Sequence, residues 1–264
     1  MSNVSVRARD LAHLANYTYH LNTRNTDLSG LHAQLQQLHL ALHVNPGNPF
    51  YDMPSGHHGY MAVTDKDTVV AIRGSGEPDD WRNNLRFWQE SYWLGGAVHA
   101  GFALAARGIT QTILAELQRV PALYDNKALW LTGHSSGGSV AILVAQELAA
   151  HQIEIAGIYT FGAPKVGNRR HADAYPLRER VHAFATLGDL VPLLPPAWFA
   201  YSERRLLLQC YRHVRKPTLL IGKTVSLRAA YAHFQNERSG LLEKIVGASL
   251  ILAPHSLAAA YIPI

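Results

Sequence analysis

A serine flanked by glycines is the first residue whose surroundings could do chemistry. Residues 133–138 read Gly-His-Ser-Ser-Gly-Gly, so Ser135 is the centre of a G-x-S-x-G pattern. In that pattern the serine lies on a sharp turn from a strand into a helix, and the residues two before and two after it must be very small because strand and helix nearly touch there. Gly133 and Gly137 meet that need. The pattern predicts a nucleophilic serine at a helix N-terminus.

A nucleophilic serine needs a base that takes its proton and an acid that orients the base. In folds that carry this turn, the order along the chain is serine, acid, histidine. Only two aspartates follow Ser135. Asp173 lies in a polar, charged stretch and is expected on the surface, whereas Asp189 directly follows an expected strand over 181–186. The order therefore favours Asp189 as the acid.

The candidate bases are the histidines after Asp189. They are His213, His233 and His255 among the fifteen histidines of the chain. His233 lies in a helical run without a motif, and His255 follows an apolar run over 250–253. Chain order alone leaves the three open.

The elements around these residues predict an α/β protein. Short apolar strands alternate with helices from residue 102 onward, which is typical of a mostly parallel sheet with helices on both faces. Ligands bind at the carboxyl ends of the strands in such sheets, where Ser135 and Asp189 follow their strands. The expected strands are 60–64 and 68–72, which form a hairpin, and then 128–132, 157–161 and 181–186; the expected helices are 102–119 and 139–150.

The N-terminal 45 residues are predicted to be helical. Five leucines recur at helical spacing, and a Pro- and Gly-rich stretch over 45–49 then ends the pattern. These leucines are Leu28, Leu31, Leu35, Leu38 and Leu42. The chain has no internal repeat and no linker, so residues 1–264 are predicted to form a single domain with helices over about 1–45.

Four segments resemble the class 3 (fungal-type) lipases of the α/β-hydrolase fold. Besides the turn at Ser135, they are residues 70–75 (Val-Ala-Ile-Arg-Gly-Ser), 98–102 (Val-His-Ala-Gly-Phe) and 159–168 (Tyr-Thr-Phe-Gly-Ala-Pro-Lys-Val-Gly-Asn). The resemblance extends from about residue 59 to the C-terminus. Ser136 stands where leucine is usual and Ser75 where threonine is commoner. The resemblance implies an α/β-hydrolase fold.

The resemblance also selects among the histidines. Residues 211–214 are similar to a family segment whose histidine is not the base, whereas His255 with Ser256 and Tyr261 resembles the family's final His-Ser-x-x-x-Tyr stretch. The Leu-Val-Pro run after Asp189 resembles the segment that follows the family's acid. The implied catalytic triad is Ser135, Asp189 and His255.

An oxyanion hole requires two N–H donors near the nucleophile. One is expected from the backbone of Ser136. The other is expected from Ser75, after the strand 68–72, through its N–H and its hydroxyl. Residues 76–94 resemble the family's lid: Asp80 could cap a helix in which Trp81, Leu85 and Trp88 share a face, and a plain amphipathic surface helix is the alternative. Residues 224–244 could form a second cover, and the role of 197–245 is open.

Composition narrows the partners. The chain has 48% apolar and 16% charged residues, which excludes a largely disordered chain, and no window is apolar enough to span a membrane. Nine Lys/Arg and three acids fall within 200–245, which gives this stretch a net charge of +6. The whole chain has a net charge of +5, so the charges outside the stretch nearly cancel. That stretch is either a solvated basic face or a surface attracted to anionic lipid headgroups; it lacks the interleaved aromatics of a nucleic-acid channel, so no nucleic acid is expected.

No cofactor and no metal are expected. The single cysteine, Cys210, permits no internal disulfide and no cysteine-based zinc site, and the paired His57 and His58 lack metal-ligand spacing. Residues 1–7 lack the apolar core of a signal peptide, which predicts a cytoplasmic protein or one exported without a cleavable signal.

The sequence therefore predicts a serine carboxylic-ester hydrolase with lipid ester substrates, of the triacylglycerol lipase or phospholipase type. One alternative is a phospholipase A1-like enzyme that attacks membranes, as an exported antibacterial toxin. A second alternative is a catalytically silent lipid-binding protein, against which the complete serine, aspartate and histidine order argues.

Overall fold

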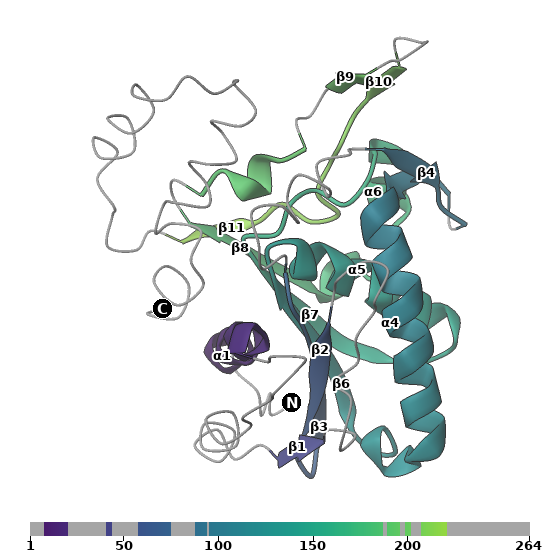
Figure 1. The fold of residues 1–264 in the computed structure, drawn as a ribbon, viewed down its shortest axis with the longest axis vertical. Helices are drawn as coiled ribbons and strands as arrows, with labels where there is room; N and C mark the ends of the chain where they lie inside the picture. The colour runs from purple at the N-terminus through teal and green to yellow at the C-terminus, as the bar shows by residue number, and fades with distance from the viewer. Residues whose placement is uncertain are drawn as a thin grey trace.

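A seven-stranded sheet forms the centre of the molecule (Figure 1). The computed structural model describes residues 8–20, 41–43, 58–74, 88–93, 95–186, 189–195, 199–201 and 207–220. The strand order is β1-β2-β3-β6-β7-β8-β11, antiparallel from β1 to β3 and parallel from β3 to β11. The strands are β1 (Ala41–His43), β2 (Gly59–Val63), β3 (Asp67–Ile72), β6 (Ala128–His134), β7 (Ile155–Phe161), β8 (Val181–Thr186) and β11 (Thr218–Leu220). The predicted α/β-hydrolase class with a mostly parallel sheet is confirmed.

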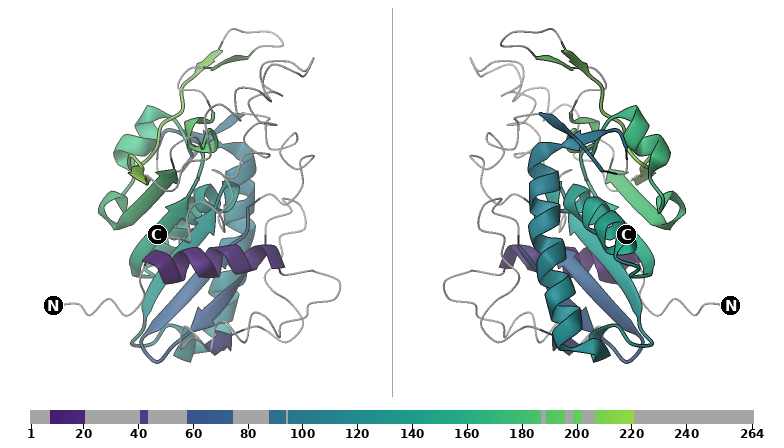
Figure 2. Two further views of the ribbon diagram at one scale, coloured as in Figure 1. Left: turned by 90° about the vertical axis from the view of Figure 1, so that its left-hand side faces the viewer. Right: turned by 90° about the vertical axis from the view of Figure 1, so that its right-hand side faces the viewer.

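Helices cover both faces of the sheet. Helix α1 (Ala8–Tyr17) lies across the strands on one face, and α4 (Ala100–Arg119) and α5 (Ser136–Ala150) cover the other (Figures 1 and 2). Alternate residues along a strand point to opposite faces. Accordingly Met61, Val70 and Ile72 join the core under α4 and α5, whereas Tyr60, Ala62, Val69 and Ala71 pack with Leu11 and Leu14 of α1.

Helix α5 is buried nearly all round. Thirteen of its fifteen residues are buried, because it lies against β6 and β7 on one side and α4 on the other. A helix that is apolar on every side is typical of such a central position. It begins at Ser136, three residues before the predicted start, because the turn at Ser135 passes directly into helical backbone.

The remaining described elements are two small sheets, one short helix and four 3-10 turns. Two-stranded sheets join β4 (Gln89–Ser91) to β5 (Ala97–His99) and β9 (Phe199–Tyr201) to β10 (Leu207–Gln209). Helix α6 (Arg169–Ala174) and the 3-10 turns η1 (Thr18–His20), η2 (Pro121–Leu123), η3 (Arg178–Arg180) and η4 (Val191–Leu193) complete the described elements. Within these stretches, no helix is both long enough and apolar enough to cross a bilayer.

The N-terminal prediction is correct in one place and wrong in another. Helix α1 lies within the predicted helical region, but Leu42 belongs to strand β1, which pairs antiparallel with β2. An exposed edge of β2 offers unpaired N–H and C=O groups, and pairing with them outweighs a local helical periodicity. The remaining leucines of the stripe lie outside the described residues. The predicted hairpin is confirmed as β2 and β3.

Candidate active site

Ser135 occupies a strained turn between β6 and α5. Its backbone angles are φ 55° and ψ −135°, a region that side chains other than glycine rarely adopt. Two hydrogen bonds hold it there: its N–H donates to Phe161 O (2.9 Å), and its carbonyl accepts from Gly138 N–H (3.0 Å). The Ser135 hydroxyl is buried and makes no hydrogen bond in the part of the chain that the structure describes. Strain of this kind is characteristic of functional sites.

The glycines around Ser135 are there because backbone passes too close for a side chain. A Cβ on Gly133 would lie 2.5 Å from the carbonyl carbon of Gly137, and a Cβ on Gly137 would lie 2.6 Å from the carbonyl carbon of Arg73. The predicted close approach of strand and helix is confirmed. Helix α5 also contacts the end of β3, which brings a second strand end close to Ser135.

The turn after β3 packs directly on this site. A Cβ on Gly74 would lie 2.6 Å from the carbonyl oxygen of His134 and 3.0 Å from Ser135 Cβ. Ser75 is the next residue and lies outside the described residues, so its oxyanion role stays a prediction. Ser136 is the first residue of α5 and is buried at the helix N-terminus, where N–H groups point out of the helix. Both expected donors therefore adjoin backbone that is packed at Ser135.

Asp189 follows β8 and is 7% exposed. Its N–H donates to Thr186 O (3.2 Å), and its Oδ1 accepts from Val191 N–H (2.9 Å). These bonds fix one oxygen of the carboxylate in the loop that leads into η4. The structure confirms the predicted location of Asp189, just after the carboxyl end of a buried strand.

Two basic side chains clamp the loop after Asp189, and the sequence motifs assigned neither this role. The Lys165 ammonium donates to Leu193 O and to Pro195 O (2.9 Å), and Lys165 N–H donates to Leu194 O (2.7 Å). The His213 Nε2–H donates to Pro192 O (2.7 Å). Burial lowers the pKa of Lys165 to about 8. Burial also lowers the pKa of His213 to about 4; the bond to Pro192 opposes this shift, and the charge of Lys165 adds a smaller lowering contribution to it. His213 is thus neutral near pH 7 and is engaged with the backbone.

The spacing of β6 and β8 is suited to a triad. Strand β7 separates them, and neighbouring strands lie about 4.8 Å apart, so Ser135 and Asp189 follow strand ends roughly 10 Å apart. That distance leaves room for an imidazole between the two side chains. His233 and His255 lie outside the described residues, so the assignment of the base stays a prediction.

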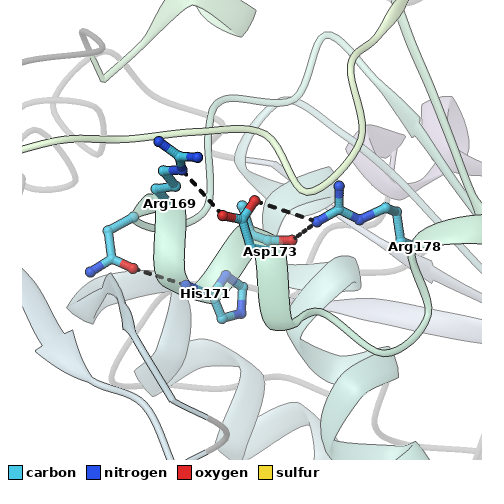
Figure 3. A network of polar contacts seen from close by, with 6 residues as sticks. Arg169, His171, Asp173 and Arg178 are labelled. Atoms are coloured by element: carbon cyan, nitrogen blue, oxygen red, sulfur yellow. Dashed lines mark hydrogen bonds and ion pairs between the residues drawn. The ribbon is translucent and has the colours of Figure 1, made fainter.

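The other candidates of the chain take structural places. Asp173 is on the surface, as expected, where its carboxylate pairs with Arg169 (3.2 Å) and Arg178 (3.8 Å) (Figure 3). His171 is buried beside it, with Nε2 at 3.0 Å from Gln146 Oε1, and burial lowers its pKa to about 4. Across the described stretches, no three His, Cys, Asp or Glu side chains come close enough to hold a metal ion.

The predicted lid helix does not include Trp88. Its carbonyl accepts from Ala100 N–H (2.9 Å), and the chain continues into strand β4, which pairs with β5. The bonds to β5 and to the start of α4 replace the helical ones. Trp88 and Trp93 are 46% and 59% exposed on either side of β4. Residues 76–87 lie outside the described residues, so the rest of the lid stays a prediction.

The comparisons with known proteins agree with this geometry. Residues 69–199 match the family model for lipase (class 3). The chain is 33% identical over 154 residues to "Secreted mono- and diacylglycerol lipase 1" of Fusarium solani and 32% identical over 141 residues to "Secreted mono- and diacylglycerol lipase A" of Penicillium cyclopium. These alignments cover 56% and 52% of this chain and 46% of each relative, so the chain matches less than half the length of either.

Solved structures show the same fold at lower identity. The mono- and diacylglycerol lipase of Aspergillus oryzae superposes with a TM-score of 0.62 at 24% identity, covering 74% of this chain and 75% of that one. The Lip2 lipase of Yarrowia lipolytica also reaches 0.62, at 20% identity, covering 81% and 76%.

Proposed function

We propose that the chain is a member of the class 3 lipase family, whose model matches residues 69–199, and that it is a carboxylic-ester hydrolase acting on lipid esters. The observation that carries the proposal is the conformation of Ser135. A buried, strained serine whose hydroxyl makes no hydrogen bond in the described part is costly to the fold, and a nucleophile is the role that explains it. A silent lipid-binding protein would have no need of that strain.

The proposed reaction uses Ser135, His255 and Asp189 in the usual roles of a triad. Ser135 Oγ attacks the acyl carbonyl while His255 takes its proton. The N–H groups of Ser136 and Ser75, together with the Ser75 hydroxyl, bind the oxyanion that forms. His255 then gives the proton to the leaving alcohol, which departs and leaves an acyl-serine. Water, deprotonated by His255, then attacks the acyl-serine, and His255 returns the proton to Ser135 Oγ as the fatty acid departs. Asp189 holds the imidazole in the tautomer that this cycle needs, and no cofactor takes part.

Glycerides are the proposed substrate class. The relatives in the comparison are named as mono- and diacylglycerol lipases, and they are named as secreted, which also supports an exported protein. The net +6 of residues 200–245 favours a second candidate, hydrolysis of phospholipids at an anionic membrane surface. Part of that charge is already paired, since Arg215 bonds Glu179 at 2.7 Å, so the glyceride proposal comes first.

The test compares the wild type with Ser135→Ala on p-nitrophenyl esters of increasing chain length. Loss of the nucleophile should lower kcat by about 10⁴–10⁶, and a serine-directed phosphonate should label the wild type at Ser135 alone. Ser139→Ala is the matched control: Ser139 is one helical turn away, its hydroxyl bonds Pro164 O (2.8 Å), and its loss should leave kcat intact. Normal turnover by Ser135→Ala would refute the proposal.

Two further comparisons sharpen the assignment. His255→Ala should match the Ser135→Ala loss, and the double variant should be little worse, because a triad acts as a unit; His233→Ala should keep turnover. A large loss at His233 with none at His255 would move the base. Emulsified diacylglycerol assayed against anionic phospholipid vesicles then separates the two substrate classes, and faster release of fatty acid from the vesicles would favour the phospholipase.

A further inference from the structure

The hydroxyl of Tyr19 lies beneath the active site, although Tyr19 is outside the part of the chain that matches the family model. Tyr19 belongs to η1, just after α1. Its hydroxyl oxygen is 2.8 Å from His134 Nδ1, a residue 115 positions later in the chain. The same oxygen accepts a hydrogen bond from the backbone N–H of Gly74, and a Cβ on Gly74 would lie only 2.6 Å from it. One hydroxyl therefore joins the ends of β3 and β6.

The two residues that it joins are those that directly precede the proposed catalytic groups. His134 precedes Ser135, and Gly74 precedes Ser75. The rate of ester hydrolysis depends on the separation between the nucleophile and the oxyanion donors, because the donors must meet an oxygen that develops about 3 Å away. A bridge between the two preceding residues sets that separation.

The hydrogen-bond roles at Tyr19 follow from its partners. The phenol oxygen accepts from Gly74 N–H, so its own proton is available to Nδ1 of His134, which places the imidazole proton of His134 on Nε2. Burial raises the pKa of Tyr19, while the nearby charge of Arg73 opposes the rise. The phenol consequently stays protonated at the pH of catalysis and stays a donor.

Several contacts hold the phenol ring and its helix in place. The Arg73 guanidinium lies over the Tyr19 ring, 5.5 Å from its centroid, and Arg73 Nη1 is 2.8 Å from His58 Nε2. Further back, Thr132 Oγ1 donates to Leu11 O (3.0 Å) and Tyr60 donates to Leu14 O (2.7 Å), which ties α1 to β6 and β2. Tyr19 thus approaches the site from a helix that is itself fixed to the sheet.

We propose that Tyr19 is a positioning residue, whose hydroxyl holds the turn at Gly74 and Ser75 at the correct distance from the turn at Ser135. This inference rests on the proposed ester hydrolase function. It acts on the transition state rather than on substrate binding, because the oxyanion forms only as Ser135 attacks. It also gives α1 a part in catalysis that the segment matched by the family model does not include.

The experiment compares Tyr19→Phe with Tyr60→Phe. Both changes remove one buried phenol hydroxyl that contacts α1 or follows it, but only Tyr19 touches the site. Tyr19→Phe should lower kcat on a short-chain p-nitrophenyl ester roughly tenfold, with KM nearly unchanged, and should slow phosphonate labelling of Ser135 by the same factor. Tyr60→Phe should lower the melting temperature and leave kcat as it is.

A second variant approaches the same bond from the other side. His134→Phe removes one of the two partners of the Tyr19 hydroxyl and so breaks the bridge to Gly74. The double variant Tyr19→Phe/His134→Phe should therefore lose little more than His134→Phe alone, because the bridge is lost when either of its bonds is lost. Additive losses, an unchanged kcat in Tyr19→Phe, or a kcat that falls only in step with melting temperature in both tyrosine variants would overturn the inference. An inactive, unlabelled wild type would instead refute the proposed function.

Discussion

Two buried aspartates lie at opposite ends of the parallel strands, and their carboxylates have different hydrogen-bond partners. Asp67 is the first residue of β3, at the amino end of the strand, and is 3% exposed. Asp189 follows the carboxyl end of β8 and is 7% exposed. The Asp67 carboxylate accepts from Trp130 Nε1 (2.9 Å) and, at 3.4 Å, from the hydroxyl of Thr64, so both of its oxygens bond side chains within the hairpin and its neighbour strand. Asp189 is bonded through Oδ1 to the backbone of its own loop.

Since both aspartates are buried, burial of the carboxylate is not what singles out Asp189 as the proposed acid. What distinguishes Asp189 is its position at the carboxyl end of a strand. Strands β3, β6, β7 and β8 run parallel, so Gly74, Ser135 and Asp189 all lie at the same side of the sheet. The amino ends gather Asp67 and Trp130, whose bond joins β3 to β6. Variants at the carboxyl ends of the strands should therefore lower kcat, and variants at the amino ends should lower the free energy of unfolding.

The largest effect is expected from Asp189→Asn. The amide keeps the volume and an oxygen for Val191 N–H, but its NH₂ end faces the base as a donor and imposes the wrong tautomer, so kcat should fall by about 10⁴. Melting temperature should change little. The measurement is kcat on a p-nitrophenyl ester beside a thermal melt. An Asp189→Asn variant that keeps wild-type kcat would show that the acid is elsewhere.

A smaller loss of kcat is expected at Ser75. Removing one oxyanion donor costs about 10²–10³ in kcat, so Ser75→Ala should lose kcat with KM nearly unchanged, while Ser75→Thr keeps the hydroxyl and should stay active. Steady-state kinetics of both variants at matched stability tests this. If the alanine variant equals the wild type, the hydroxyl has no part and only the backbone N–H of Ser75 remains as donor.

At the amino ends of the strands, Asp67→Ala should lower the free energy of unfolding and leave kcat unchanged. The change leaves the buried Trp130 N–H without the acceptor at 2.9 Å, which costs about 1–3 kcal/mol of unfolding free energy. Asp67→Asn can still offer an oxygen to Trp130 and should cost less. Urea denaturation gives the free energies, and kcat of the folded fraction should equal that of the wild type. A kcat loss as large as that of Asp189→Asn would contradict the expectation that only residues at the carboxyl ends of the strands affect catalysis.

The last effect is a pH dependence of stability in the loop that follows Asp189. The pKa of His213 is about 4 in the folded protein against an ordinary 6.5, so the unfolded chain takes up a proton as the pH falls through 6.5 while the folded chain does not. The stability present above pH 6.5 is therefore lost progressively between 6.5 and 4.

His213→Asn should make the melting temperature fall less steeply over that interval, with catalysis retained at pH 7. Part of the slope should persist, because buried His171 has a pKa of about 4 as well. Melting curves at pH 7.5, 5.5 and 4.5 measure the slope. An unchanged slope would mean that proton uptake by His213 does not contribute.

Much of the site could be predicted because its signals are local. Gly133 is dictated by the backbone of Gly137, four residues later, whereas Gly137 faces the backbone of Arg73 at the end of another strand; the G-x-S-x-G pattern marks both. Asp189 follows from chain order and from its place after a buried strand. Strands β3, β6, β7 and β8 carry short apolar runs that identify them without neighbours. The position of Leu42 could not be predicted in this way, since its helical periodicity is overridden by pairing of β1 with the edge of β2.

The sequence by itself predicted a nucleophilic serine, an acid and a parallel sheet, since each prediction depends on residue types at short spacings. The structure confirms the sheet, and the triad stays a prediction. Only the tertiary structure decided what holds those groups in place. Tyr19 reaches His134 across 115 residues, and Lys165 and His213 meet the loop after Asp189 from separate segments. A single polar side chain leaves no periodic trace in a sequence, and its partner exists only once the chain has brought distant backbone to within hydrogen-bond distance.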